Sequence, residues 1–160
     1  MSVKPSDLWF LDLEGTIITD WDSMCGLNPI LINANTIRRL LELNNVKSIN
    51  IFSFAIQDNS DQLLFYFELE NKLRHALGIN IKQVPTMVEM YDIIFNNPVF
   101  PFEKVNHLIK LGKAEVFKQY CIAQYKDITV NIIDDEVSTN LIQVDNLNIN
   151  YINVDKIKVA

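Results

Sequence analysis

The sequence predicts an α/β protein built on a doubly wound, mostly parallel sheet. Short apolar runs of strand length alternate along the chain with longer segments that carry helix-capping residues and helical periodicity. Several of these runs end in an acid or a serine, which is typical of buried parallel strands that present a polar site at their carboxyl ends. Strands that alternate with helices imply helices on both faces of the sheet.

Five segments are expected to form the strands. They are residues 8–13, 48–53, 79–84, 127–133 and 149–154. The first of them is apolar apart from Asp12, as expected of a strand that is buried on both faces. Residues 15–29 mix small, polar and aromatic types and are expected to form a loop or a short hairpin.

Capping residues mark the helices between these strands. Helices are expected at residues 36–44, 58–78, 86–96, 113–125 and 138–144. Asp58 supplies an N-cap and Gly78 a C-terminal stop, while Thr86 and Glu89 have the spacing of a capping box. The spacing also leaves room for a small insertion near residues 96–110.

Composition and charge narrow the class of protein. The chain has 160 residues, 49% hydrophobic and 21% charged, which is typical of one globular domain over residues 1–160. The net charge of −6 disfavours general binding to nucleic acid, although a local basic pocket could still serve it. Cys25 and Cys121 form no CxxC pair, and His75 and His107 show no ligand spacing, so we expect neither a disulfide framework nor a zinc site.

The expected location is the cytoplasm, with no membrane segment. Asp7 and Asp12 interrupt the apolar stretch near the N-terminus, which a signal peptide would not tolerate. No apolar run approaches the ~18 residues that a membrane-spanning helix needs.

Polar side chains gather at the expected carboxyl ends of three strands. These ends carry Asp12, Glu14 and Thr16 after the first strand, Ser53 after the second, and Asp134-Asp135 after the fourth. Lys113 begins the helix that leads into the fourth strand, although Lys110 or Lys118 could take its place. Ligands bind at this edge of open α/β sheets, so we expect the carboxylates, the hydroxyls and the ammonium to converge on one rim.

Such a set of groups is what phosphoryl transfer requires. A carboxylate can attack phosphorus and form an aspartyl-phosphate, while a lysine and a hydroxyl hold the oxygens of the transferred group. A divalent cation must screen the phosphate from the acids, and Mg²⁺ prefers one or two carboxylates together with substrate oxygens. A second acid is needed to protonate the leaving oxygen and then to activate water.

The same residues resemble, in order along the chain, the four motifs of the haloacid dehalogenase (HAD) superfamily. Residues 12–16 resemble the first motif, usually written DxDGT, Ser53 the second, Lys113 the third and Asp134-Asp135 the fourth. The motifs cover residues 8–140. The resemblance implies a Rossmann-like, HAD-like domain, and the spacings between the motifs leave room for a flap but not for a large cap domain.

The resemblance also implies roles around a bound Mg²⁺ ion. Asp12 would be the nucleophile and a metal ligand. Glu14 would be the general acid/base, with its backbone carbonyl also reaching the metal. Asp134 would bind Mg²⁺ directly, and Asp135 directly or through water.

The remaining motif residues would contact the phosphate. Thr16 would help to position the loop, and Ser53 and Lys113 would bind the phosphate. The implied function is a Mg²⁺-dependent phosphohydrolase that acts on an exposed phosphomonoester of unknown class. Without a cap, the flap, the substrate or oligomerisation would have to cover the site. Trp21 and Phe54 follow the first two motifs and would either border the entrance or pack beneath it.

Two alternatives stay open. Glu14 stands where most phosphatases of the family have Asp, which together with the acidic surface suggests a catalytically weak or inactive binding or regulatory protein on the same scaffold. Abundant Asn and Ile with only 4 Gly indicate an AT-rich genome, such as that of a phage.

The second alternative is a phosphoacceptor receiver domain, which uses similar groups. Its acidic pair follows the first strand, however, whereas Asp134-Asp135 comes late in this chain.

Overall fold

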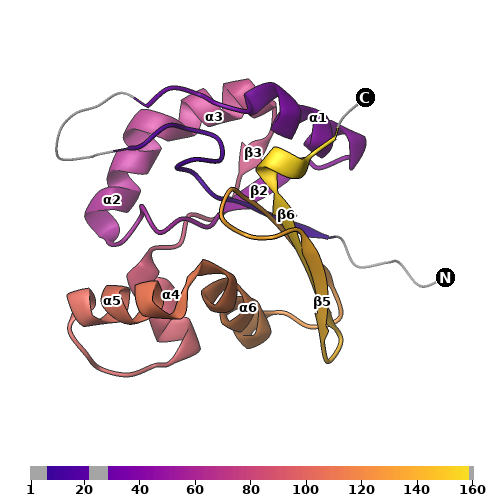
Figure 1. Ribbon diagram of the computed structural model, residues 1–160. Coiled ribbons are helices and arrows are strands. Elements are labelled where there is room, and N and C mark those ends of the chain that lie inside the picture. Colours follow the sequence, from indigo (N-terminus) through magenta and orange to yellow (C-terminus); the bar gives the residue numbers. More distant parts are fainter. Residues whose placement is uncertain (1–6, 22–28, 159–160) are drawn as a thin grey trace.

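A six-stranded sheet forms the centre of the protein (Figure 1). The computed structural model describes residues 7–21 and 29–158. The strand order is β3-β2-β1-β4-β6-β5, and all neighbours are parallel except β5 and β6. The strands are β1 (Leu8–Leu11), β2 (Ser48–Ile51), β3 (Asn80–Ile81), β4 (Thr129–Asp134), β5 (Asn140–Val144) and β6 (Leu147–Asn153). The prediction of a mostly parallel α/β sheet is confirmed.

Helices flank this sheet in two groups. The first group comprises α1 (Ala34–Leu43), α2 (Asn59–Leu64), the π-helical turn η1 (Phe65–Leu69) and α3 (Glu70–Leu77). The second comprises α4 (Met87–Ile94), α5 (Pro101–Leu111) and α6 (Lys113–Gln124). Figure 1 shows the two groups on opposite sides of the sheet. A short 3₁₀ helix, η2 (Val154–Lys156), follows β6.

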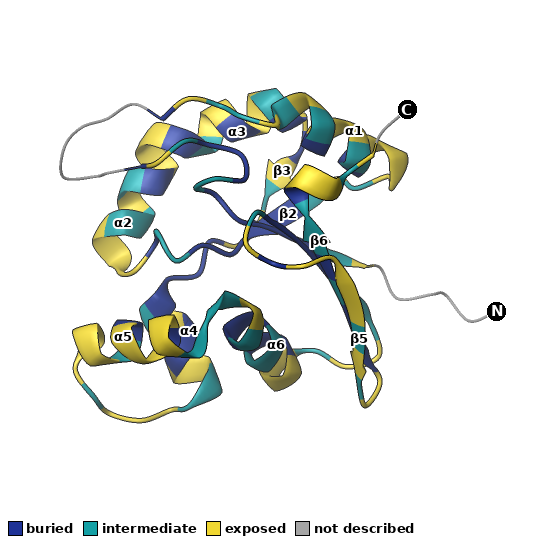
Figure 2. Ribbon diagram, in the orientation of Figure 1, coloured by how far each residue is buried: buried dark blue, intermediate teal, exposed yellow. Residues whose placement is uncertain are grey.

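Each helical group closes its own hydrophobic core against the sheet. Because successive side chains of a strand point to opposite faces, Trp9 and Leu11 lie in the core beneath α1–α3, whereas Phe10 lies in the core beneath α4–α6. Phe10 and Phe117 meet there edge to face, with ring centroids 5.1 Å apart. Figure 2 shows buried residues along the central strands and exposed residues on the outer sides of the helices.

The expected caps lie where the sequence places them. The Asp58 side chain accepts a hydrogen bond from the backbone N–H of Asp61 (3.1 Å), and the Thr86 hydroxyl accepts one from that of Glu89 (3.1 Å). Gly78 ends α3 with a left-handed backbone, φ 65°. These local bonds satisfy backbone donors that helix ends would otherwise leave unpaired.

The helix expected at residues 138–144 is wrong, because Asn140–Val144 forms strand β5. β5 pairs antiparallel with β6 through a hairpin whose turn contains Asp145, with φ 53°. Asp and Asn are both favoured in turns, and Asp tolerates the left-handed conformation that Asp145 adopts here. Pairing with an existing sheet edge outweighs the weak helical tendency of so short a segment.

Other segments differ from the prediction in their length or their structure. The third strand is shorter than residues 79–84: β3 comprises Asn80–Ile81, although backbone hydrogen bonds to β2 continue to Lys82 and Gln83. The region that left room for an insertion forms α5, which begins at Pro101, a residue suited to the first helical turn. None of the helices in the described ranges is both long and apolar enough to cross a membrane.

Candidate active site

The chain reverses its direction of winding across the sheet between β1 and β4. β1 leads outward to β2 and β3 on one side, and the chain then returns to place β4 on the other side of β1. β1 and β4 run parallel, with Leu11 opposite Ile133, and the backbone N–H of Asp12 donates to the Ile133 carbonyl (3.0 Å). Such a reversal point is where open α/β sheets bind ligands.

Three aspartates meet at this point. One carboxylate oxygen each from Asp12, Asp134 and Asp135 lie within 4.8 Å of one another. Asp12 is 1% exposed and Asp134 0% exposed. The structure thus brings together the acids that follow β1 and β4, although the two strands lie far apart in the sequence.

The ammonium of Lys113, the first residue of α6, lies among these acids. Its Nζ is 3.2 Å from Oδ1 of Asp12, 3.1 Å from Oδ2 of Asp134 and 3.8 Å from Oε2 of Glu136. Only 10% of the lysine side chain is exposed. Nζ also lies 5.7 Å from the ring centroid of Phe54, which forms one side of its surroundings.

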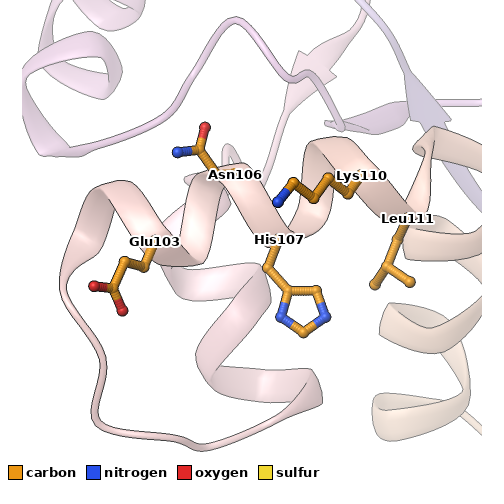
Figure 3. Close-up of a pocket in the computed structure, with 5 residues that line it drawn as sticks. All are labelled: Glu103, Asn106, His107, Lys110 and Leu111. Atoms are coloured by element: carbon orange, nitrogen blue, oxygen red, sulfur yellow. The ribbon is translucent and has the colours of Figure 1, made fainter.

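Lys110 occupies a different environment. It lies on the exposed side of α5 in a surface pocket of about 460 Å³, whose lining residues all belong to that helix: Glu103, Asn106, His107, Lys110 and Leu111 (Figure 3). None of the clustered acids lines this pocket. Of the two lysines, Lys113 is therefore the one that reaches the acids.

The turn after β1 brings Thr16 back onto the cluster. The backbone N–H groups of Thr16 and Ile17 both donate to the Leu13 carbonyl, at 3.1 and 3.0 Å. The Thr16 hydroxyl lies 3.0 Å from Oδ2 of Asp12 and 3.3 Å from Oδ1 of Asp135. It therefore links the acids that follow β1 and β4.

This turn requires glycine at position 15. Gly15 has φ 77°, a left-handed conformation that side chains with a Cβ rarely adopt. A Cβ there would also overlap Oδ2 of Asp135 and lie 2.9 Å from its Cγ. The closeness of Asp135 to the turn thus depends on the absence of a side chain.

Glu14 does not join the three aspartates through its carboxylate. Its Oε2 instead accepts a hydrogen bond from the backbone N–H of Trp21 (2.8 Å). Trp21 is buried in the core beneath α1–α3, so of the two arrangements considered for it, packing is the one observed. Glu14 is half-buried and lies on the same turn as Asp12.

Ser53 lies at the carboxyl end of β2, next to β1. The backbone N–H of the preceding residue, Phe52, donates to the Leu11 carbonyl (3.0 Å), which holds the two strand ends together. Ser53 is 1% exposed, and its hydroxyl accepts a hydrogen bond from the backbone N–H of Ala55 (3.1 Å). The hydroxyl therefore shapes its own turn at this edge of the sheet.

Burial and mutual repulsion perturb the ionisation of the cluster. Burial, together with the negative charge of Asp134, raises the pKa of Asp12 to about 8, against the opposing effects of Lys113 and Thr16. Burial likewise raises the pKa of Asp134, although the Lys113 ammonium opposes the shift. Burial alone would lower the pKa of Lys113, but the charges of Asp12 and Asp134 raise it above its ordinary value.

A divalent cation fits this cluster. Oδ2 of Asp134 is fully buried and accepts no hydrogen bond of good geometry from any described residue, and the Lys113 ammonium lies 3.1 Å from it. Oδ1 of the same side chain accepts from the backbone N–H of Glu136 (2.7 Å). Burial keeps the pKa values of Asp12 and Asp134 raised even beside the Lys113 ammonium, so further positive charge would stabilise their ionised forms. Oxygen-only ligands of this kind suit a hard cation such as Mg²⁺.

Two residues of the site belong to none of the sequence motifs. Glu136 adds a further carboxylate near Lys113, and it could have been noticed only as the next acid after Asp134-Asp135. Asn153, at the end of β6, donates to the carbonyls of Asp135 (3.2 Å) and Val137 (2.8 Å) and so anchors the loop that carries the acids. The sequence is rich in asparagine, so a single asparagine does not predict that role.

Comparisons with known proteins assign no function to the site, so its interpretation depends on its chemistry. No protein-family model, no curated protein and no solved structure matches this chain.

Proposed function

We propose that this protein is a Mg²⁺-dependent phosphomonoesterase of the HAD type on a doubly wound sheet, with Asp12 as its nucleophile. The observation that carries the proposal is the position of the Lys113 ammonium, in contact with Asp12 and Asp134 at the reversal point of the sheet. Buried carboxylates beside a lysine and a hydroxyl form a site for a dianion only when a metal supplies further positive charge.

The ligands for Mg²⁺ would be Asp12, Asp134 and Asp135, whose carboxylate oxygens already lie within 4.8 Å of one another. The backbone carbonyl of Glu14 is a further candidate. When bound, Mg²⁺ would offset the negative charges of these acids and of the phosphate. Oδ2 of Asp134 is the ligand atom that would benefit most, because it is fully buried and, among the described residues, has the ion pair with Lys113 as its compensation.

Asp12 would act as nucleophile in its ionised form. A carboxylate oxygen of Asp12 forms a bond to phosphorus, and the bond from phosphorus to the ester oxygen breaks. Glu14 gives a proton to that leaving oxygen. Glu14 then takes a proton from a water molecule, whose oxygen attacks phosphorus, and the bond from phosphorus to Asp12 breaks to release inorganic phosphate.

The other residues hold reactants in place. The ammonium of Lys113, 3.2 Å from Oδ1 of Asp12, would contact phosphate oxygens and orient Asp12, and the hydroxyl of Thr16 would orient the other oxygen of Asp12. Ser53 lies at the neighbouring strand end, and a phosphate that approaches the sheet edge could accept its O–H. The natural partner would be a phosphorylated molecule, and a cytoplasmic location would supply Mg²⁺.

A substrate screen tests the proposal. Purified protein is assayed for phosphate release from aryl phosphates, nucleotides, 3′- and 5′-phosphorylated oligonucleotides, phosphopeptides and sugar phosphates, with Mg²⁺ or with EDTA. We expect turnover that needs Mg²⁺ and that falls by about 10⁴-fold or more in Asp12→Asn. Turnover that survives this substitution would remove Asp12 from its role.

One observation favours a second candidate, a non-catalytic binding protein on the same scaffold. The Glu14 carboxylate is engaged by the backbone N–H of Trp21, and Lys113 already partly neutralises the acids. This candidate expects Mg²⁺ binding without phosphate release from any substrate. A gain of activity in Glu14→Asp would instead identify a degenerate enzyme.

A further inference from the structure

A chain of two hydrogen bonds connects Glu14 to a helix on the face of the sheet. The backbone N–H of Trp21 donates to Oε2 of Glu14 (2.8 Å), and the indole N–H of the same residue donates to Oε2 of Glu68 (3.1 Å). Trp21 is 6% exposed, so its ring is held within the core while both of its N–H groups are used. One residue therefore ties two carboxylates from separate parts of the chain.

Glu68 belongs to the π-helical turn η1, between α2 and α3. The buried side chains of Phe65 and Leu69 anchor this turn in the core, and Glu68 precedes Leu69 directly. A π turn adds a residue to a helical turn, which changes the direction of the side chains around it, and such turns occur often at functional sites. Figure 1 shows the segment after β1, in indigo, running beside the helices that η1 connects.

We propose that Glu68 is a positioning residue: by holding the indole of Trp21, it sets the backbone N–H that orients the Glu14 carboxylate for proton transfer to the leaving group. This inference rests on the proposed phosphomonoesterase function. Glu14 is one carbon longer than Asp and needs such a restraint more, because proton transfer depends on placement of the acid within hydrogen-bond reach of the leaving oxygen.

Leaving-group dependence distinguishes positioning from structural support. Hydrolysis of phenyl phosphate needs a proton on the departing oxygen, whereas 2,4-dinitrophenyl phosphate loses a stable anion and needs none. We expect Glu68→Ala to lower kcat/KM for phenyl phosphate by about tenfold or more while changing kcat/KM for 2,4-dinitrophenyl phosphate by less than about twofold. The ratio kcat/KM reports the step in which the leaving group departs, and not the later hydrolysis of the aspartyl-phosphate, in which Glu14 acts on both substrates alike. Glu68→Gln, which keeps an oxygen acceptor, should recover most of the loss, and Trp21→Phe, which lacks the indole N–H, should reproduce it.

Glu70→Ala is the matched control, because Glu70 lies two residues on and pairs with Arg74 on the surface. It should leave both substrates unchanged. Equal losses of kcat/KM for the two substrates in Glu68→Ala would show that Glu68 only stabilises the fold, and unchanged kcat/KM for both would show that it has no role. Either result overturns the proposal.

Hydrogen exchange of the Trp21 backbone amide tests the link from Glu68 through Trp21 to Glu14, and it does not require enzymatic activity. Protection should fall in Glu68→Ala and stay at the wild-type level in Glu70→Ala. Unchanged protection in Glu68→Ala overturns the inference even if the protein is a phosphatase. Reduced protection in a protein that releases phosphate from no substrate of the screen shows that the hydrogen-bonded link exists, but refutes the phosphatase function and with it the catalytic part of this inference.

Discussion

The ammonium nitrogen of Lys113 lies 3.1 Å from Oδ2 of Asp134, a fully buried carboxylate oxygen that accepts no hydrogen bond within the described ranges of the chain. The lysine is therefore the main compensation for a buried negative charge. Removing one partner of a buried ion pair is costly, because the remaining charge has neither water nor a counterion.

Lys113→Met should strongly destabilise the protein. We expect the free energy of unfolding at about pH 8 to fall by about 3–5 kcal/mol, measured by chemical denaturation in EDTA. The loss should be smaller at about pH 5, because Asp12, whose pKa is raised to about 8, becomes protonated and no longer needs the ammonium. Lys110→Met is the control and should stay within about 0.5 kcal/mol of wild type, since Lys110 is exposed. Similar losses in both variants would contradict the assignment of Lys113.

Asp12 should make the metal-free protein less stable as the pH rises. Its pKa is raised from 3.8 to about 8 in the folded protein, so the folded state binds the proton more tightly than the unfolded state. The resulting stabilisation is complete below about pH 4 and is lost as the pH rises towards about 8. The slope should not exceed about 1.4 kcal/mol per pH unit. Denaturation curves in EDTA between about pH 5 and about pH 8 measure it.

Asp12→Asn removes this titration. The variant should show a flatter pH dependence and should be more stable than wild type near pH 8, because it lacks a charge that burial and the negative charge of Asp134 both disfavour. Asp145→Asn is the control, since Asp145 is an exposed residue in the β5–β6 turn with φ 53°, a conformation that Asn also tolerates. A wild-type curve that rises with pH over the same range would show that the folded protein does not raise the Asp12 pKa.

Mg²⁺ should stabilise the folded protein. At a free concentration about 100 times Kd, binding to the native state alone adds about 2.7 kcal/mol, which thermal denaturation with and without EDTA detects as a rise in Tm. Asp134→Asn and Asp135→Asn should abolish most of this rise, because their oxygens belong to the candidate cluster. Asp127→Asn, which changes an exposed acid outside that cluster, should retain it. An equal rise in all of these proteins would place the bound ion elsewhere.

Gly15→Ala should impair metal binding as well as stability. Its positive φ costs about 1–2 kcal/mol once a Cβ is present, and that Cβ overlaps the Asp135 carboxylate. Gly78→Ala has a comparable φ of 65°, but its Cβ would meet only the mobile end of the Arg38 side chain, at 3.2 Å. Both variants should lose stability in EDTA, but only Gly15→Ala should also lose the Mg²⁺-dependent rise in Tm. If Gly78→Ala loses that rise too, the effect comes from backbone strain and not from displacement of Asp135.

Local features of the chain were sufficient to predict most helix ends and the strands that carry the site. The caps at Asp58 and Thr86 and the stop at Gly78 each involve residues close in sequence. The local sequence pattern therefore already names both partners of the hydrogen bond that ends the helix. The acids that follow β1 and β4 are visible for a related reason. Apolar runs reveal buried strands, and parallel strands place their carboxyl ends at one edge.

The prediction of a helix at residues 138–144 failed because the periodicity of a short segment does not settle its structure. Asn140–Val144 has too few residues to stabilise an isolated helix, so the neighbouring edge of β6 decides its conformation. The turn at Asp145 was a usable signal for a hairpin, but its importance depends on the strand that follows it.

The sequence alone determined which chemical groups could lie at the carboxyl edge of the sheet, because it specifies which residues follow each apolar strand segment. Only the tertiary structure decided which of them touch. It selected Lys113 over Lys110, added Asn153 as an anchor, and tied Glu14 to Glu68 through Trp21. Contacts between side chains far apart in sequence depend on how the helices pack over the sheet, and packing depends on the shape of the whole core rather than on any local pattern.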